Sequence, residues 1–224
     1  TVREFLVAEV TPERIRAAWE TPTGRSDELW AQLVGLGLTG ITVAEEHGGL
    51  GMNELDFVLL AEEMGYVALP EPLIDTVLVG APLLARCANA GLAAEWLPRV
   101  AAGEAKLAIG LECHPLVADA HVADLLLLQH GEEMHAVRRA DVTPVANESL
   151  DPSRRLFRVD WTPSAQSCIA AGAAGRALVD AALHRGALGA AAQCLGLPQS
   201  MIYSSVAYTL DRKQFGQAIG TFQA

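Results

Sequence analysis

Apolar residues recur at helical spacing through the first hundred positions, and they predict a series of short helices. Between Val2 and Trp19 the apolar stripe is interrupted at Thr11-Pro12. A threonine that can cap a helix, followed by a proline at the first helical position, marks the start of a second helix. Ser26 or Asp27 caps a third helix, which stops at Gly35. Helices are predicted over residues 28–34, 53–64, 75–88 and 92–102.

From Lys106 onward the pattern changes to short apolar or alternating runs that turn residues separate. Such runs are typical of β-strands. The predicted strands cover residues 107–111, 124–129, 134–137, 142–145 and 156–159. They indicate a small β-domain that lies between two helical parts of the chain.

The last part of the chain begins with a long alanine-rich run over residues 173–208, which contains glycines and one proline, Pro198. A continuous helix of this length would span about 55 Å. Because that is long for an ordinary globular helix, we expect it to lie along a subunit interface. Gly216 follows the basic pair Arg212-Lys213, and this arrangement predicts a helix stop with cations at the negative end of the helix dipole.

These patterns predict an α+β fold with three domains. The N-terminal helical domain covers residues 1–103, and a shortened central β-domain covers residues 104–170. Residues 171–224 begin a C-terminal helical domain that is incomplete here.

Composition and charge argue against some classes of binding partner. The 224 residues are 51% hydrophobic and 19% charged, which indicates a globular chain. The net charge of -11 argues against nucleic acid and against an anionic membrane surface, since both require a basic face. No apolar run reaches the ~18 residues of a spanning helix. Four scattered cysteines, none in a Cys-x-x-Cys pair, and no secretory signal at Thr1 favour reduced thiols in the cytoplasm.

One glycine motif resembles a dinucleotide-binding loop, but its context does not support that function. Gly35, Gly37 and Gly40 spell Gly-x-Gly-x-x-Gly, but a dinucleotide loop must follow a strand and open a helix. Here a predicted helix precedes the glycines and an extended segment, residues 41–43, is expected after them. We therefore interpret the glycines as a helix end and a turn.

Histidines and a cysteine in the β-domain raise the question of a metal. None of their spacings matches a zinc set, and separate strands would have to converge on one point. The sequence therefore predicts no metal site. These residues are His114, His121, His130, His135 and Cys113.

The two ends of the chain resemble the acyl-CoA dehydrogenase family. Arg212-Lys213-Gln214-Phe215-Gly216, followed by Ile219 and Phe222-Gln223, resembles a signature of that family. Residues 30–65 resemble its N-terminal pattern, in which a Glu-Glu-x-Gly-Gly-x-Gly loop (residues 45–51) precedes a helix that ends Glu-Glu-x-Gly (residues 62–65). In that family the corresponding signature residues contact FAD bound to a neighbouring subunit. The resemblance therefore implies that Arg212, Gln214, Phe215 and Gln223 bind FAD.

The chain also departs from the family pattern in two places. Residues 111–120 match poorly the β-domain segment that embraces the flavin in that family. The catalytic glutamate of the family, which removes the α-proton while hydride passes to the flavin, lies either in a late loop or near the start of the long helix. The second location falls near Gly186, and no Glu follows Glu148. We therefore expect no catalytic residue in this chain.

These departures resemble the base-lacking subunit of actinobacterial α2β2 acyl-CoA dehydrogenases that act on steroid side chains. The resemblance implies a homologous catalytic partner, FAD shared across their interface, and α,β-dehydrogenation of an acyl-CoA, with a steroid side-chain ester as the suggested acyl group. Two alternatives stay open. The chain is a flavin-free structural partner, or it is a homomeric dehydrogenase cut before its catalytic glutamate.

Overall fold

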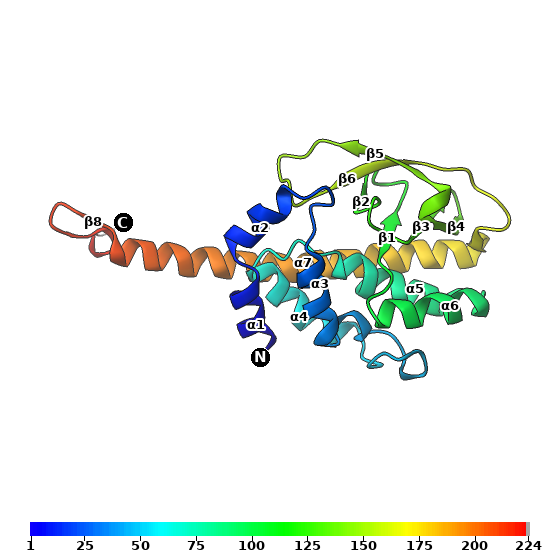
Figure 1. Ribbon diagram of the computed structural model, residues 1–224, viewed down its shortest axis with the longest axis horizontal. Coiled ribbons are helices and arrows are strands. Elements are labelled where there is room, and N and C mark those ends of the chain that lie inside the picture. Colours follow the sequence, from blue (N-terminus) through cyan, green and yellow to red (C-terminus); the bar gives the residue numbers. More distant parts are fainter. Residues whose placement is uncertain (223–224) are drawn as a thin grey trace.

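The computed structural model describes residues 1–222, which are arranged along one long helix. Helix α7, Gly172–Asp211, has 40 residues and extends along the whole molecule (Figure 1). At 1.5 Å per residue it is about 60 Å long. Pro198 lies inside it without ending it, so the predicted continuous rod is confirmed.

Six shorter helices precede the strands, and their starts follow the predicted caps. The Thr11 hydroxyl accepts from the Arg14 amide at 3.3 Å, and the Ser26 hydroxyl accepts from the Leu29 amide at 3.2 Å. Each cap satisfies an amide that lacks a partner in the first helical turn. The helices are α1 Val2–Glu9, α2 Pro12–Trp19, α3 Asp27–Gly35, α4 Glu54–Tyr66, α5 Ala81–Arg86 and α6 Ala90–Ala101.

The expectation of an extended segment at residues 41–43 is wrong. A 3-10 turn, Leu38–Gly40, leads into Ile41 with helical dihedral angles, and the chain then folds back on itself. The amides of Leu50 and Gly51 donate to the carbonyls of Gly40 and Val43 at 2.9 and 2.8 Å. A Cβ atom on Gly49 would lie 2.1 Å from the Val43 carbonyl oxygen, so only glycine allows this close approach.

The helix predicted over residues 75–88 forms as two pieces. Its first part, Ile74–Gly80, is a π-helix that continues directly into α5. Pro82 has no amide to donate to the preceding turn. Side chains from outside the helix supply donors to this turn. Thr42 Oγ1 donates to the Val77 carbonyl, and Arg185 Nη1 donates to the Leu78 carbonyl at 3.2 Å.

Two small sheets occupy residues 107–170. The larger sheet has the order β1-β3-β4-β7, with β1 parallel to β3 and the other pairs antiparallel. The smaller sheet, β2-β6-β5, is antiparallel throughout. The five predicted strands are present, whereas β2 and β7, with two and three residues, are too short to give a pattern. The strands are β1 Leu107–Gly110, β2 Val117–Ala118, β3 Leu125–His130, β4 Glu133–Arg138, β5 Thr143–Asn147, β6 Leu156–Asp160 and β7 Cys168–Ala170.

Small residues on one face of α7 bring its backbone against its neighbours. A Cβ atom on Gly196 would lie 1.9 Å from the Glu62 carbonyl oxygen of α4, and one on Gly65 would lie 2.2 Å from the Gln193 carbonyl oxygen. The two helices are therefore in backbone contact. The buried residues of α7 are Gly175, Leu178, Ala182, Gly189, Ala192 and Gly196, separated by three, four or seven positions.

Helix α7 contributes to two of the three apolar clusters. Ala192 packs with the cluster of α1, α3 and α4, while Leu178 and Ala182 pack with the cluster of α5, α6 and the larger sheet. The third cluster lies between the two sheets and includes Val117, Leu126 and Phe157. The order of helices, strands and a final long helix confirms the predicted α+β class. The domain limits at residues 103 and 170 stay predictions.

Within the part of the chain that the structure describes, no helix combines the length and apolarity needed to cross a membrane.

Alanine substitutions in α7 test its contact with α4. We expect Gly196→Ala to lower the free energy of unfolding by about 1–3 kcal/mol, because its methyl group meets the backbone of α4. Gly186→Ala is the matched control, since a Cβ atom there has no heavy atom within 4 Å. The control should gain up to about 1 kcal/mol from helix propensity. Urea unfolding measures both, and equal stability of the two variants would contradict the close α4–α7 contact.

Candidate functional site

A short hairpin follows α7 and carries most of the residues predicted to bind FAD. Strand β8, Lys213–Gln214, pairs with β9, Gln217–Ala218, through the two residues Phe215 and Gly216. Their φ angles are +52° and +83°, the combination that a tight type I′ turn requires. The prediction that Gly216 stops the helix is therefore wrong. The helix ends at Asp211, and Gly216 turns the hairpin instead.

The hairpin presents an aromatic ring and a cation on its surface. Phe215 is 95% exposed, and its ring stands edge-on to that of Phe222 at 6.3 Å between centroids. A positive φ is unfavourable for a bulky residue, and such outliers concentrate at functional sites. Arg212 is exposed at the C-cap of α7, and Gln214 is exposed beside it. The structure thus brings Arg212, Gln214 and Phe215 together, while Gln223 lies outside the described residues.

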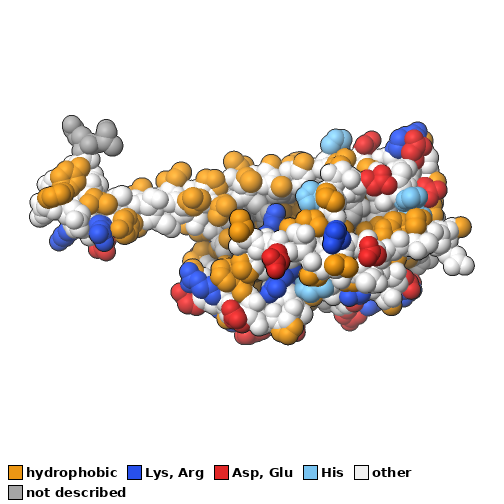
Figure 2. Space-filling view, turned by 90° about the horizontal axis from the view of Figure 1, so that it is seen from above, with side chains coloured by type: hydrophobic (Ala, Val, Ile, Leu, Met, Phe, Trp, Pro, Cys, Tyr) orange, Lys and Arg blue, Asp and Glu red, His pale blue; other side chains and the backbone are white. Residues whose placement is uncertain are grey.

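The part of α7 that leads to the hairpin projects beyond the rest of the molecule and is largely apolar. Figure 2 shows hydrophobic side chains along this projecting rod. Tyr203 reaches back to Tyr66 of α4, with 6.5 Å between the ring centroids. The exposed large apolar residues of this region are Leu195, Leu197, Met201, Ile202, Tyr203, Val206, Tyr208 and Leu210. We call this set the α7 tail surface.

The position predicted to lack a catalytic base lies in the middle of α7. Gly186 is half-buried, and a side chain there would enter open space. Its neighbour Arg185 is directed into the molecule, where Nη2 lies 3.2 Å from the Glu54 carboxylate of α4. Helix α7 contains no glutamate. The chain therefore offers space at this position but no carboxylate.

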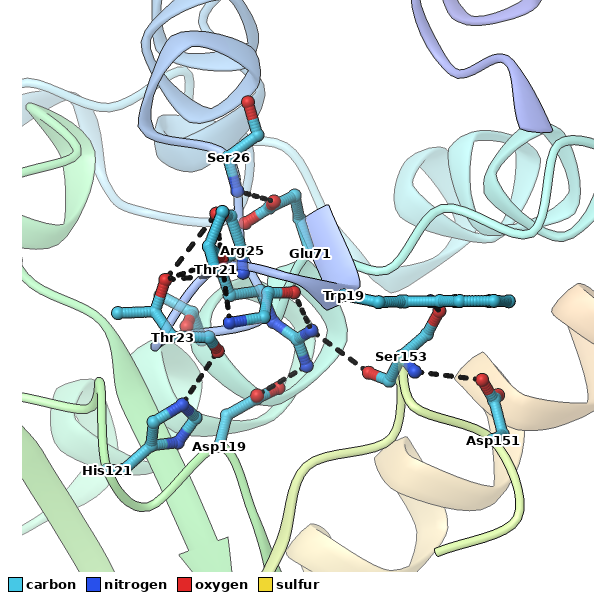
Figure 3. A network of polar contacts seen from close by, with 12 residues as sticks. Trp19, Thr21, Thr23, Arg25, Ser26, Glu71, Asp119, His121, Asp151 and Ser153 are labelled. Atoms are coloured by element: carbon cyan, nitrogen blue, oxygen red, sulfur yellow. Dashed lines mark hydrogen bonds and ion pairs between the residues drawn. The ribbon is translucent and has the colours of Figure 1, made fainter. Parts of the chain in front are cut away.

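A polar network around the buried Arg25–Asp119 pair joins the segment before α3 to two loops of the β-region (Figure 3). The guanidinium of Arg25 forms an ion pair with the carboxylate of Asp119 and donates to the Ser153 carbonyl at 2.9 Å. The Trp19 indole donates to the Ser153 hydroxyl at 2.6 Å, and His121 Nε2 lies 2.8 Å from the Thr23 carbonyl oxygen. Asp119 lies near the end of residues 111–120, so its ion pair with Arg25 holds that end of the segment in place.

Three acidic side chains lie in or beside this network, and burial acts on all of them. Burial raises the pKa of Asp75 to about 7, and the charge of Asp119 adds to the effect. Burial also raises the pKa values of Glu71 and Asp119, although the Ser26 amide opposes the shift at Glu71 and Arg25 opposes it at Asp119. No local sequence pattern indicated this network, since Arg25 and Asp119 are 94 residues apart.

The histidines considered for a metal do not meet at one point. His114 and His130 are exposed, as is Cys113, and His114 Nδ1 lies 3.0 Å from the Leu116 carbonyl oxygen. His121 belongs to the polar network, stacked at 4.6 Å on Phe157. His135 is buried in the larger sheet, with 1% of its surface exposed.

Residues 1–104 match the family model of the acyl-CoA dehydrogenase N-terminal domain. Acyl-CoA dehydrogenase IpdE2 of Mycobacterium tuberculosis is 31% identical over the whole chain, and that of Mycolicibacterium smegmatis is 32% identical. The chain spans 66% and 67% of the lengths of these two relatives.

Solved structures share the fold at lower identity. The ChsE4-ChsE5 complex from Mycobacterium tuberculosis matches with a TM-score of 0.82 and 22% identity, over 99% of this chain and 68% of the matched chain. The Tcur3481-Tcur3483 steroid ACAD G363A variant matches with a TM-score of 0.80 and 22% identity, over 98% of this chain and 67% of that one. At this identity the likeness shows the fold alone.

Asp75 predicts a specific dependence of stability on pH. Its pKa is about 7 in the folded state, above its ordinary value of 3.8, so the folded protein holds a proton that the unfolded chain releases. The stabilisation is complete below about pH 4 and is lost as pH rises to about 7. We expect Asp75→Asn to exceed the native protein in stability at pH 8 by on the order of 2 kcal/mol, and the difference to shrink towards pH 5.

Urea unfolding at pH 5, 6, 7 and 8 checks this expectation, with Asp180→Asn on the exposed face of α7 as the control. The control should follow the native curve at every pH. A constant difference between Asp75→Asn and the native protein would show that Asp75 is ionised throughout.

Proposed function

The chain belongs to the acyl-CoA dehydrogenase family, and from that premise we propose that it is a subunit of a FAD-dependent enzyme that α,β-dehydrogenates a CoA thioester. In this proposal it completes the flavin site of a homologous catalytic subunit. The observation that carries the proposal is the exposed hairpin at the end of α7, with Arg212, Gln214 and Phe215 on its surface.

The chemistry of the hairpin fits one side of a flavin site. An arginine can hold a phosphate or other anionic oxygen pair through two hydrogen bonds, an amide both donates and accepts, and an exposed ring can pack on a flat ring system. The hairpin that carries Phe215 lies far from the two larger sheets, at the end of the projecting rod where Figure 1 labels β8. These residues would therefore contact FAD that is held mainly by another chain, together with Gln223.

The middle of α7 supports a division of labour between two subunits. Removal of the α-proton of a thioester needs a positioned carboxylate, and bound FAD would accept the hydride. Gly186 offers no such group, and the side chain of Arg185 is engaged with Glu54 and the Leu78 carbonyl. We assign the base to the partner and no catalytic residue to this chain.

The β-region supports the same division. Residues 111–120 correspond in order to the family's flavin-embracing segment, yet Asp119 is paired with Arg25 inside the buried network. The Oδ1 atom of this carboxylate is engaged by Arg25. The chain's contribution to the cofactor is thus proposed to come from the hairpin rather than from its own β-domain.

The partner is proposed to be a homologous subunit in an α2β2 assembly. The α7 tail surface consists of exposed apolar side chains distributed around the projecting helix, and exposed apolar surface of this kind is typical of protein interfaces. The ChsE4-ChsE5 complex and the Tcur3481-Tcur3483 steroid ACAD are each named for two components, and the second name mentions a steroid. By analogy, we propose a steroid side-chain CoA ester as the substrate. We propose the cytoplasm as the location, where the four free cysteines would stay reduced.

Substitutions in the hairpin test the proposed flavin contact. In the complex purified with its partner, we expect Arg212→Ala to weaken flavin binding by about 10-fold or more, since a hydrogen bond to a charged group contributes about 1.5–3 kcal/mol. We expect Phe215→Ala to weaken it by about 10-fold through the loss of ring packing. Lys213→Ala, the neighbouring cation in β8, is the matched control and should retain the flavin. Flavin absorbance after dialysis gives the occupancy, and gel filtration reports whether the complex persists.

Full flavin occupancy in the Arg212 and Phe215 variants would contradict the shared site. Loss of the complex together with the flavin in these variants would indicate a purely structural partner.

A further inference from the structure

A second group of reactive side chains lies at the far edge of the larger sheet, away from the hairpin. Glu133 and His135 are two positions apart in β4, so their side chains share one face of the strand. Cys168 in β7 is paired directly with His135 across the ladder. One ligand atom from each of the three residues lies within 4.8 Å of the others.

A β-bulge contributes to this convergence. The register between β4 and β7 shifts at Met134 and His135, which are paired with Ala170 and Cys168, so Ile169 is the extra residue. Bulges re-aim side chains and are frequent next to functional sites. Here the bulge sets the thiol of Cys168 beside the imidazole instead of on the opposite face.

The hydrogen bonds around His135 indicate which nitrogen is free to bind a cation. Ser167 Oγ lies 3.0 Å from His135 Nδ1, and the same hydroxyl donates to the Ser164 carbonyl at 3.1 Å. Ser167 Oγ also lies 3.1 Å from Ser164 Oγ, so this hydroxyl can serve His135 Nδ1 as donor or as acceptor. In either case Ser167 occupies Nδ1, and Nε2 faces the Glu133 carboxylate, whose Oε2 lies 3.1 Å away.

A neutral imidazole with its proton on Nδ1 would set the Nε2 lone pair against the carboxylate, and a metal ion bound by both groups would remove that repulsion. Cys168 adds a sulfur ligand to the nitrogen and the oxygen. Its thiol now donates weakly to the Ala170 carbonyl at 3.5 Å, and this contact is easily given up for a metal.

The surroundings of the group are those of a metal site with a route to solvent. The His135 side chain is 1% exposed, whereas that of Glu133 is 44% exposed, so an ion can enter past the carboxylate. Trp161 covers the imidazole edge-on at 5.1 Å between centroids. The Ser167 hydroxyl orients His135 in the way that outer hydrogen bonds orient metal-bound histidines.

We propose that Glu133, His135 and Cys168 bind one Zn²⁺, with water in the fourth position. Zinc accepts this mixture of oxygen, nitrogen and sulfur in a tetrahedron with bonds of about 2.0–2.3 Å, which sets its ligand atoms about 3.3–3.7 Å apart. The Glu133–His135 separation is already near this value, and rotation of the Cys168 side chain brings in the sulfur. His130, with its ring 6.3 Å from that of His135, is the candidate to replace the water.

This site was not expected from the sequence. A Glu-x-His pair with a cysteine 33 positions later matches no zinc spacing, and only the pairing of β4 with β7 joins them. The inference is independent of the proposed flavin contact, since none of its residues lies in the hairpin or in α7.

The experiment uses the full chain, freed of metal with a chelator under reducing conditions. Zinc is titrated in competition with a chromophoric chelator, and Co²⁺ replaces zinc for absorption spectroscopy. We expect one equivalent of tight binding and a sulfur-to-cobalt charge-transfer band in the near ultraviolet. Binding should weaken as pH falls, because the imidazole and the thiol must both be deprotonated.

Matched variants separate a built site from surface binding. Cys168→Ser and Glu133→Gln should weaken zinc binding by at least 100-fold, and Ser167→Ala by about 10- to 100-fold through loss of orientation. Cys113→Ser and Glu104→Gln alter an exposed cysteine and an exposed carboxylate elsewhere and should bind like the native chain. Zinc affinity unchanged in Cys168→Ser, or a cobalt spectrum of the native chain without a sulfur band, would overturn the proposal. Failure of the native chain to bind one equivalent of zinc tightly would also overturn the proposal.

Discussion

The backbone contact between α7 and α4 is the constraint on which the rest of the structure depends. Glycine at positions 65 and 196 lets the two helices approach until one backbone meets the other, a distance that any side chain would increase. Leu178 and Ala182 on the same face of α7 pack with the cluster of α5, α6 and the larger sheet. One rigid rod therefore aligns the N-terminal helices with the β-region, and its far end carries the hairpin outward.

This rod has two ends with different environments. The buried residues of α7 run from Gly175 to Gly196, whereas the α7 tail surface is exposed and apolar. A helix of such composition gains its stability from tertiary contacts rather than from propensity alone. The α7 tail surface, the hairpin and the open position at Gly186 are together consistent with a chain that supplies one side of a composite site. The buried pair Arg25–Asp119 joins the segment before α3 to the β-region.

Local features of the fold could be predicted from the sequence because each depends on neighbouring residues. The caps at Thr11 and Ser26 and the continuous α7 are of this kind. The turn at Gly216 was misassigned because Arg-Lys before a glycine is compatible with a helix end, and only the pairing of β8 with β9 shows a hairpin. Arg25 and Asp119 could not be paired in advance, since no local pattern connects residues on different elements. The small-residue face of α7 was visible as scattered glycines, but its partner α4 was not.

The central claim is that this chain shares a flavin with a different subunit, and the visible absorption spectrum tests it most directly. The protein is purified alone and also after co-expression with its homologous partner, and the flavin content of each is measured. The account predicts flavin only in the complex, at about one FAD per pair of unlike chains, and bleaching when acyl-CoA is added. One flavin per protomer in the chain alone would contradict the account and indicate a homomeric enzyme.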